Sequence, residues 1–231
     1  MFRILVLIVA VAGLTGCQTL NYYKSAHLGR VDDSRTVLIM PPDVELSELS
    51  AAGAPIPKAE WTDQAKTHMD KALQKILAER RAHMVNYQRS AADDDPDSPN
   101  VQLIKLHNVV GNSAIVHHLF EQMKLPNKHG KFDWTLGDGT RRLAHQYGTD
   151  FALFTYVRDS YTSGGRALAI TAAALLGVGL QGGRQFGFAT LVDLRSGEIV
   201  WFNLLARGNG DLRQYAPAEE TVRALLEKFP S

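Results

Sequence analysis

The stretch that decides the fold is G-F-A-T-L-V-D-L-R-S-G-E-I-V-W-F-N, residues 187–203. Two runs of β-forming residues flank the polar turn R-S-G-E at 195–198, a pattern typical of a β-hairpin whose first strand covers 186–193. Alternate residues of that strand fall on opposite faces, with Phe188 on one face and Leu191 on the other. Because both faces are largely apolar, we expect the hairpin to lie inside a sheet that is covered on both sides.

Segments on either side of the hairpin add further strands and helices. The run T-V-L-I-M at 36–40, closed by two prolines, predicts a buried first strand. Apolar residues at helical spacing from Trp61 to Leu77 predict a helix with one apolar face, and a second amphipathic helix is expected at 218–229. The other expectations are an ambiguous segment at 44–52, a strand at 84–87, a long helix at 101–124, a short helix at 140–147, a strand at 151–157 and a polar turn at 159–165. This order predicts a single α/β (α+β) domain at 35–231, in which a mixed sheet is flanked by helices.

The N-terminus has the features of a secretory signal. Arg3 precedes a short apolar run that is too short to span a bilayer and ends in L-T-G-C at 14–17. A small residue directly before a cysteine resembles the bacterial lipobox, which implies that the Cys17 thiol carries acyl chains such as palmitate and that the signal is cut just before it. We therefore expect a cleaved lipoprotein signal peptide at 1–16, and a lipidated cysteine with a flexible tether at 17–34.

Lipidation also predicts a location. Two or more acyl chains anchor a protein stably, because each buried CH₂ contributes roughly 0.8 kcal/mol. Gln18 follows the cysteine, and a residue other than Asp at that position favours sorting to the outer membrane in Gram-negative cells. We therefore expect a lipid-anchored protein of the bacterial cell envelope, attached to the outer membrane and facing the periplasm.

Composition and charge exclude one class of partner. The chain has 231 residues, a net charge of +1 and charged side chains that are scattered along its length. It has neither a strong long-range field nor a basic stripe with interleaved aromatic residues, so nucleic-acid binding is not expected. Cys17 is the only cysteine, and as a lipid anchor it leaves no thiol for a disulfide.

Motifs for metal binding or catalysis are weak. The acidic residues at 93–97 lack the spacing of a calcium loop and indicate a solvated loop. No G-x-S-x-G motif is present, and Asp159, Asp193 and Glu198 are assigned to turns. An H-E-x-x-H motif is also absent, although six residues have metal-ligating chemistry: His107, His117, His118, Glu121, His129 and His145. We expect no metal, no cofactor and no enzymatic activity.

The segment at 167–180, A-L-A-I-T-A-A-A-L-L-G-V-G-L, carries no charge. Its 14 residues are too few to span a bilayer as a helix, which needs about 20. One interpretation is a buried helix or strand pair in the core, and we favour it. The other is a hairpin or helix that contacts a membrane or a neighbouring subunit, with an interface formed by Leu175, Leu176, Val178 and Leu180.

The final third of the chain resembles a known family. The segment D-F-A-L-F at 150–154 and the hairpin at 187–203 are similar to those of the periplasmic lipoproteins related to the curli secretion protein CsgG and the penicillin-binding-protein activator LpoB. The first strand, V-L-I-M-P-P, followed by a long helix, also suits that α/β domain. The chain is more similar still to a group of bacterial lipoproteins that carry P-P-D-V-E-L (41–46) and F-T-Y-V-R-D-S-Y (154–161). The resemblance implies a fold more than a function.

These observations predict a non-enzymatic, lipid-anchored envelope protein that binds another envelope protein as an accessory or assembly factor. The alternative is a subunit of an oligomeric envelope secretion or transport complex that uses 167–180 as its subunit or membrane contact. The expected partners are therefore a membrane, through the lipid anchor, and another envelope protein, with a homo-oligomer as a further possibility.

Overall fold

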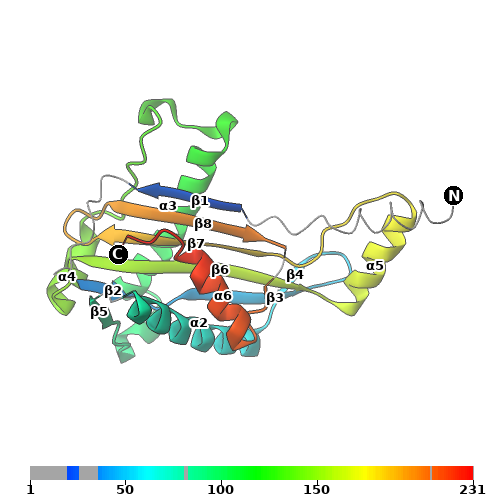
Figure 1. Ribbon diagram of the computed structural model, residues 1–231, viewed down its shortest axis with the longest axis horizontal. Coiled ribbons are helices and arrows are strands. Elements are labelled where there is room, and N and C mark those ends of the chain that lie inside the picture. The colour runs from blue at the N-terminus through cyan, green and yellow to red at the C-terminus, as the bar shows by residue number, and fades with distance from the viewer. Residues whose placement is uncertain (1–19, 26–35, 81–82, 209, 231) are drawn as a thin grey trace.

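The central feature of the protein is a mixed sheet, seen in a computed structural model that describes residues 20–25, 36–80, 83–208 and 210–230. Within these residues, six strands follow the order β1-β8-β7-β6-β2-β5, and β3 and β4 extend the sheet beside β6 (Figure 1). The strands are β1 (Leu20–Ser25), β2 (Thr36–Ile39), β3 (Asp43–Leu49), β4 (Pro55–Pro57), β5 (His83–Asn86), β6 (Phe151–Thr162), β7 (Gln185–Asp193) and β8 (Ile199–Arg207).

The main helices are α2 (Ala59–Glu79), α3 (Pro99–Leu119), α4 (Arg141–Tyr147), α5 (Gly164–Leu175) and α6 (Tyr215–Leu225). Four short 3-10 turns accompany them: η1 (Ala91–Asp94), η2 (Glu121–Met123), η3 (Pro126–Lys128) and η4 (Asp138–Thr140). The expected α/β class, a mixed sheet flanked by helices, is confirmed. The ambiguous segment at 44–52 is mostly strand β3.

The long strand β6 organises the sheet. It pairs antiparallel with β7 on one edge, whereas its other edge pairs in parallel first with β2 and then with β3. Pro41 and Pro42 separate β2 from β3, because proline has no N–H to donate to a ladder. Just before this break, the Met40 amide still donates to the Leu153 carbonyl over 3.0 Å.

Both faces of the sheet are covered, as the alternation in the hairpin predicts. Leu191 belongs to the apolar cluster that packs under α2 and α6, and Phe188 belongs to the cluster on the α3 side. The hairpin turn also forms as expected, since the Asp193 carboxylate accepts from the amides of Arg195 and Ser196 over 2.8 and 3.1 Å. β7 and β8 therefore form the centre of the core.

Helix α3 approaches the sheet closely at Gly111. A Cβ atom at this position would lie 2.2 Å from Cε2 of Phe188, a fully buried ring. That ring stacks on Phe202 and on Tyr156, at centroid distances of 5.5 and 4.9 Å. The glycine is therefore required by packing, and it leaves the helix uninterrupted over Pro99–Leu119.

Two expectations about where strands are present and where they end are wrong. Part of the predicted tether at 17–34 is a strand: Leu20–Ser25 pairs antiparallel with β8, with Leu20 opposite Ala206. The predicted polar turn at 159–165 is in its first half a continuation of β6, which pairs with β3 as far as Thr162. The expected signal peptide at 1–16 and Cys17 lie outside the described residues.

Candidate functional site: an apolar arm

An arm, residues 160–184, projects from one end of the sheet (Figure 1). It consists of the last residues of β6, helix α5 and a segment that returns to β7. Helix α5 begins where the Ser163 hydroxyl accepts from the amide of Arg166 over 3.1 Å, as an N-cap. The sequence S-G-G-R therefore turns the chain directly from strand into helix.

Hydrogen bonds close the base of the arm. The Ser160 amide donates to the Arg184 carbonyl over 3.0 Å, and the Gly183 amide donates to the Thr162 hydroxyl over 2.8 Å. Farther out, the Arg166 guanidinium donates to the Gln181 carbonyl over 2.8 Å, which fastens the returning segment to the helix. Its polar contacts therefore hold the arm in a defined conformation.

The apolar side chains of the arm face outward. Leu168, Leu175 and Leu176 are 74%, 84% and 81% exposed, and no residue of α5 is buried. In the returning segment Val178 and Leu180 are 51% and 37% exposed. The expectation that 167–180 lies in the core is therefore wrong. The four residues predicted as an interface are instead together on the surface.

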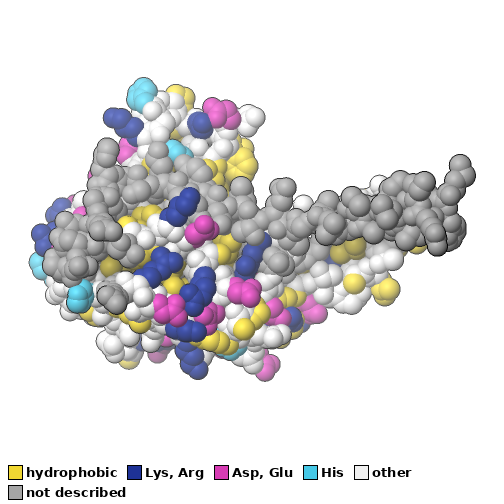
Figure 2. Space-filling view, viewed as in Figure 1, with side chains coloured by type: hydrophobic (Ala, Val, Ile, Leu, Met, Phe, Trp, Pro, Cys, Tyr) yellow, Lys and Arg dark blue, Asp and Glu magenta, His cyan; other side chains and the backbone are white. Residues whose placement is uncertain are grey.

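This exposed surface carries no charge over most of its length. Leu168 and Leu175 are seven residues apart and lie on one side of α5, while Leu176 lies about 100° farther round. From Ala167 to Gly183 the sequence has no charged residue, and Figure 2 shows the charged side chains gathered over the body of the domain. Isolated exposed apolar residues are ordinary, but a contiguous set is typical of a binding surface.

The length of α5 limits what it can contact. Its 12 residues extend over roughly 18 Å, at about 1.5 Å per residue, whereas the hydrocarbon core of a bilayer is about 30 Å thick. Across the described ranges, no helix has the length and apolarity needed to cross a membrane.

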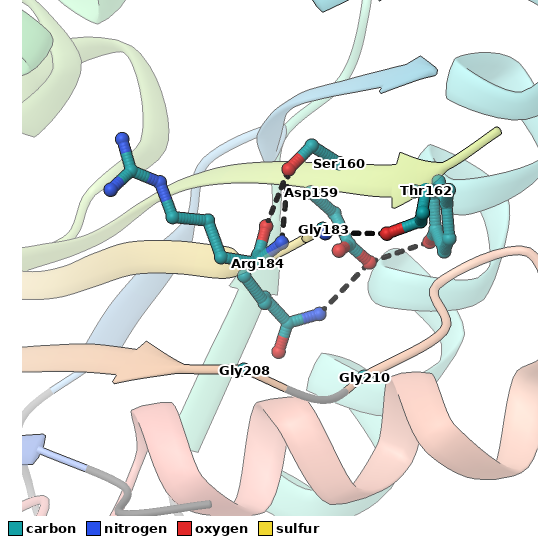
Figure 3. Close-up of a pocket in the computed structure, with 9 residues that line it drawn as sticks. Asp159, Ser160, Thr162, Gly183, Arg184, Gly208 and Gly210 are labelled. Atoms are coloured by element: carbon teal, nitrogen blue, oxygen red, sulfur yellow. Dashed lines mark hydrogen bonds between the residues drawn. The ribbon is translucent and has the colours of Figure 1, made fainter. Parts of the chain in front are cut away.

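A small pocket of about 170 Å³ lies at the base of the arm (Figure 3). Its polar groups mostly bind one another. The Ser160 hydroxyl donates to the Arg184 carbonyl over 3.1 Å and accepts from the Arg184 amide over 3.0 Å. Ser160 is therefore engaged in fixing the strand end, and no histidine lines this pocket to act as its base.

Buried beside this pocket is Asp159, which the sequence assigned to a turn. Its Oδ2 accepts from the Tyr161 hydroxyl over 2.5 Å and from the side-chain amide of Gln185 over 3.1 Å. Burial raises the pKa of the Asp159 carboxyl, while these hydrogen bonds and one from the Leu212 amide oppose that shift. The signal for its burial is the continued period-two pattern of Val157, Asp159 and Tyr161, which places all three on one face of β6.

This buried carboxylate belongs to a network that ties strand ends together. Gln185, which donates to Asp159, also accepts from the Arg207 guanidinium over 2.8 Å and from the Thr221 hydroxyl over 3.0 Å. The network thus connects β6, β7, β8 and α6 at the root of the arm. These hydrogen bonds give the network a structural role.

The histidines with metal-like chemistry are dispersed. His107 is buried and stacks on Phe154 with a centroid distance of 4.9 Å, and burial lowers the pKa of its imidazole to about 3. His117 and Glu121, predicted at i, i+4, have separate contacts: His117 Nδ1 lies 2.8 Å from the Met123 carbonyl, and Glu121 pairs with Lys124. In the part of the chain that the structure describes, no three His, Cys, Asp or Glu residues are placed to hold a metal ion. The remaining members are His118, which contacts Phe132 edge-on, and the exposed His129 and His145.

Comparison with known proteins finds distant structural matches. No protein-family model matches the chain, and no curated protein matches its sequence. Among solved structures, the PelC dodecamer from Paraburkholderia phytofirmans is 11% identical over 90% of this chain and 97% of that chain, with a TM-score of 0.39. The lipoprotein GNA1162 from Neisseria meningitidis is 14% identical over 74% of this chain and 78% of that chain, with a TM-score of 0.31. Similarity at this level does not identify a partner or an activity for the chain, and the resemblance to the CsgG and LpoB lipoproteins stays a prediction.

Proposed function

We propose that this protein is a lipid-anchored component of a bacterial envelope that acts by binding another envelope protein rather than by catalysis. The observation that carries the proposal is that apolar side chains project into solvent at two places, on the arm and in the turn that follows α3. The L-T-G-C motif at 14–17 supports the anchor, and Gln18 after the cysteine supports sorting to the outer membrane. A domain that faces the periplasm is part of the same proposal.

The polar groups of the described residues support a binding role over an enzymatic one. The buried carboxylate of Asp159 is held by three donors, and Ser160 is bonded to the Arg184 backbone. A nucleophile needs an adjacent base, and a general acid or base needs access to substrate. Neither Asp159 nor Ser160 meets these conditions, so we assign no catalytic residue.

A second apolar surface offers a site for a protein partner. Phe120 and Met123, in the turn that follows α3, are 54% and 56% exposed. Aromatic residues and methionine are enriched at protein interfaces. The arm and this turn are thus two separate candidate contacts.

A self-associating subunit of an envelope complex is the second candidate function. It is favoured by the common exposure of Leu175, Leu176, Val178 and Leu180 on one projection. In this case a second copy of the chain would cover the arm, and the protein would form an oligomer of defined size.

Crosslinking in cells tests the two functions. The tagged full-length chain is crosslinked in the envelope, extracted in mild detergent and analysed by mass spectrometry and light scattering. We expect one envelope protein to be enriched over a lipoprotein control. A single discrete homo-oligomer supports the second function, and a monomer without any enriched protein contradicts both.

Matched variants identify the contact. Phe120→Asp changes the turn after α3, and Leu176→Asp changes the arm; both side chains are exposed, so neither variant should unfold the domain. Loss of the crosslinked protein in only one of the two variants assigns the contact to that surface.

A further inference from the structure

The strand register shows where the chain enters the sheet. Leu20 lies opposite Ala206 in β8, Ala206 lies opposite Phe186 in β7, and Phe186 lies opposite Arg158 in β6. These four residues form one row across the sheet. The row lies at the end of the sheet from which the arm projects, and Figure 1 shows β1 starting at that end.

The covalent chain then limits how far a lipid on Cys17 can be from the arm. Leu20 comes three positions after Cys17, and a fully extended chain covers at most about 10–11 Å over that distance. In β6, the four steps from Arg158 to Thr162 advance by about 13 Å before α5 begins. Leu20 and Arg158 are three strand spacings apart, about 14 Å across the sheet. A lipid attached to Cys17 is therefore held at the arm end of the sheet, within about 25 Å of Arg158.

The arm has the chemistry of a segment that enters a membrane interface. Its uncharged run is bracketed by Arg166 and Arg184, so cationic groups lie where anionic headgroups would be. Helix α5 is too short to span a bilayer, and in Figure 1 it runs steeply across the direction of the strands at the tip of the arm. When the strands point toward a membrane, this helix crosses the membrane normal at an angle rather than running along it.

We propose that the arm inserts its apolar side chains into the interface of the membrane leaflet that holds the lipid on Cys17. The proposal rests on the lipid anchoring described above and adds a second point of attachment. A second copy would cover α5 only after assembly, whereas the anchor places a bilayer at this end of every copy. Leu168, Leu175 and Leu176 are the side chains that enter the acyl region.

Two points of attachment fix an orientation. A protein held only by acyl chains on Cys17 can tilt freely, whereas insertion of α5 points the strands toward the membrane. The opposite end of the sheet, with α4 and the turn at 195–198, then faces away. The Phe120–Met123 turn remains accessible to a protein partner.

Site-directed fluorescence tests this insertion. Acylation consumes the only native thiol, so Leu176→Cys in the full-length, lipidated chain provides one labelling site for an environment-sensitive fluorophore. Gln146→Cys in α4, exposed at the other end of the sheet, is the matched control. Both proteins are reconstituted into vesicles of phosphatidylethanolamine and phosphatidylglycerol, with or without bromine on the acyl chains. We expect brominated lipids to quench the label at 176 at least threefold more than the label at 146.

Different results would contradict the lipid anchoring and the insertion of the arm. If intact-mass analysis finds no acyl chains and wild-type protein does not float with vesicles, the anchoring itself is wrong. If the lipidated protein floats but both labels are quenched equally, the arm does not enter the membrane and the inference is overturned. Efficient thiol crosslinking between two copies of the Leu176→Cys variant, without quenching by bromine, assigns the arm to a subunit interface and also overturns it.

Discussion

Two uncharged segments of this chain differ in their burial. The strand segment at 186–192 is buried at the centre of the sheet, while the segment at 167–180 is exposed on the arm. Neither contains a charged residue. Apolar composition therefore does not decide burial in this protein.

The difference lies in pattern and position. In β7, large side chains alternate between two faces, each of which meets a helix layer, and the strand has neighbours on both edges. The arm is rich in alanine, has no period-two pattern and extends beyond the sheet. An apolar surface is buried when its geometry fits the other elements of the fold, and otherwise it is available to a partner.

A charge in the strand should have the largest effect. Leu191→Asp places a carboxylate at a position with no exposed surface, under α2 and α6. An unpaired buried charge destabilises by about 3–5 kcal/mol, enough to unfold many domains. We expect loss of the cooperative transition, or a strongly lowered midpoint, in urea unfolding followed by circular dichroism.

A leucine-to-aspartate substitution on the arm is the control for Leu191→Asp. Leu176→Asp should change the free energy of unfolding by no more than about 0.5 kcal/mol, because the side chain is already in water. Unfolding of this variant would mean that the arm belongs to the core, and the contrast between the two segments would disappear.

Substitution of one glycine in the core and one in the arm tests the same difference in packing. Gly111→Ala forces a Cβ atom against the Phe188 ring and should destabilise by about 1–3 kcal/mol, although alanine is the better helix former. Gly165→Ala in α5 would meet only Ala51, at an ordinary contact distance of 3.4 Å, and should be neutral or slightly stabilising. Thermal unfolding of both variants measures this, and equal effects would contradict close packing at Gly111.

The buried His107 should make the core sensitive to acid. Its folded pKa of about 3 is below the ordinary value of 6.5, so below pH 6.5 the unfolded chain binds a proton that the folded protein does not. Stability should therefore fall as pH decreases, by about 2 kcal/mol between pH 8 and pH 5 from this group alone. His107→Phe keeps a ring beside Phe154 and should flatten this slope in urea titrations at several pH values. An unchanged slope would show that the imidazole is not responsible.

Much of the fold is predictable from local patterns. The hairpin has two apolar strands around a turn whose Asp193 side chain caps it, and α2 has one apolar stripe, so each element carries its own signal. Strand β1 has no such signal, because its existence depends on pairing with β8, near the other end of the chain. The extension of β6 to Thr162 lacks a local signal for a similar reason, since polar residues there resemble a turn until β3 pairs with them.

The sequence singles out the apolar residues of the arm but does not indicate that they are exposed. Leu175, Leu176, Val178 and Leu180 were chosen because they lie in an uncharged run, and they are on the surface together. Their exposure follows from the position of the arm beyond the helix layers, and no local sequence pattern indicates that position. The polar residues at 159–165 assign Asp159 to a turn, and two of its three donors, Gln185 and Leu212, are distant from it in sequence.

The pairing of β1 with β8 has a consequence for the order of folding. Strand β1 pairs with β8, which is synthesised much later. The ladder between them can therefore form only when most of the chain has been made. Contacts this distant in sequence form slowly, and an unpaired strand can pair with the wrong chain in the meantime. A chain truncated before residue 199 would keep the L-T-G-C motif and lose β8, the strand with which β1 pairs.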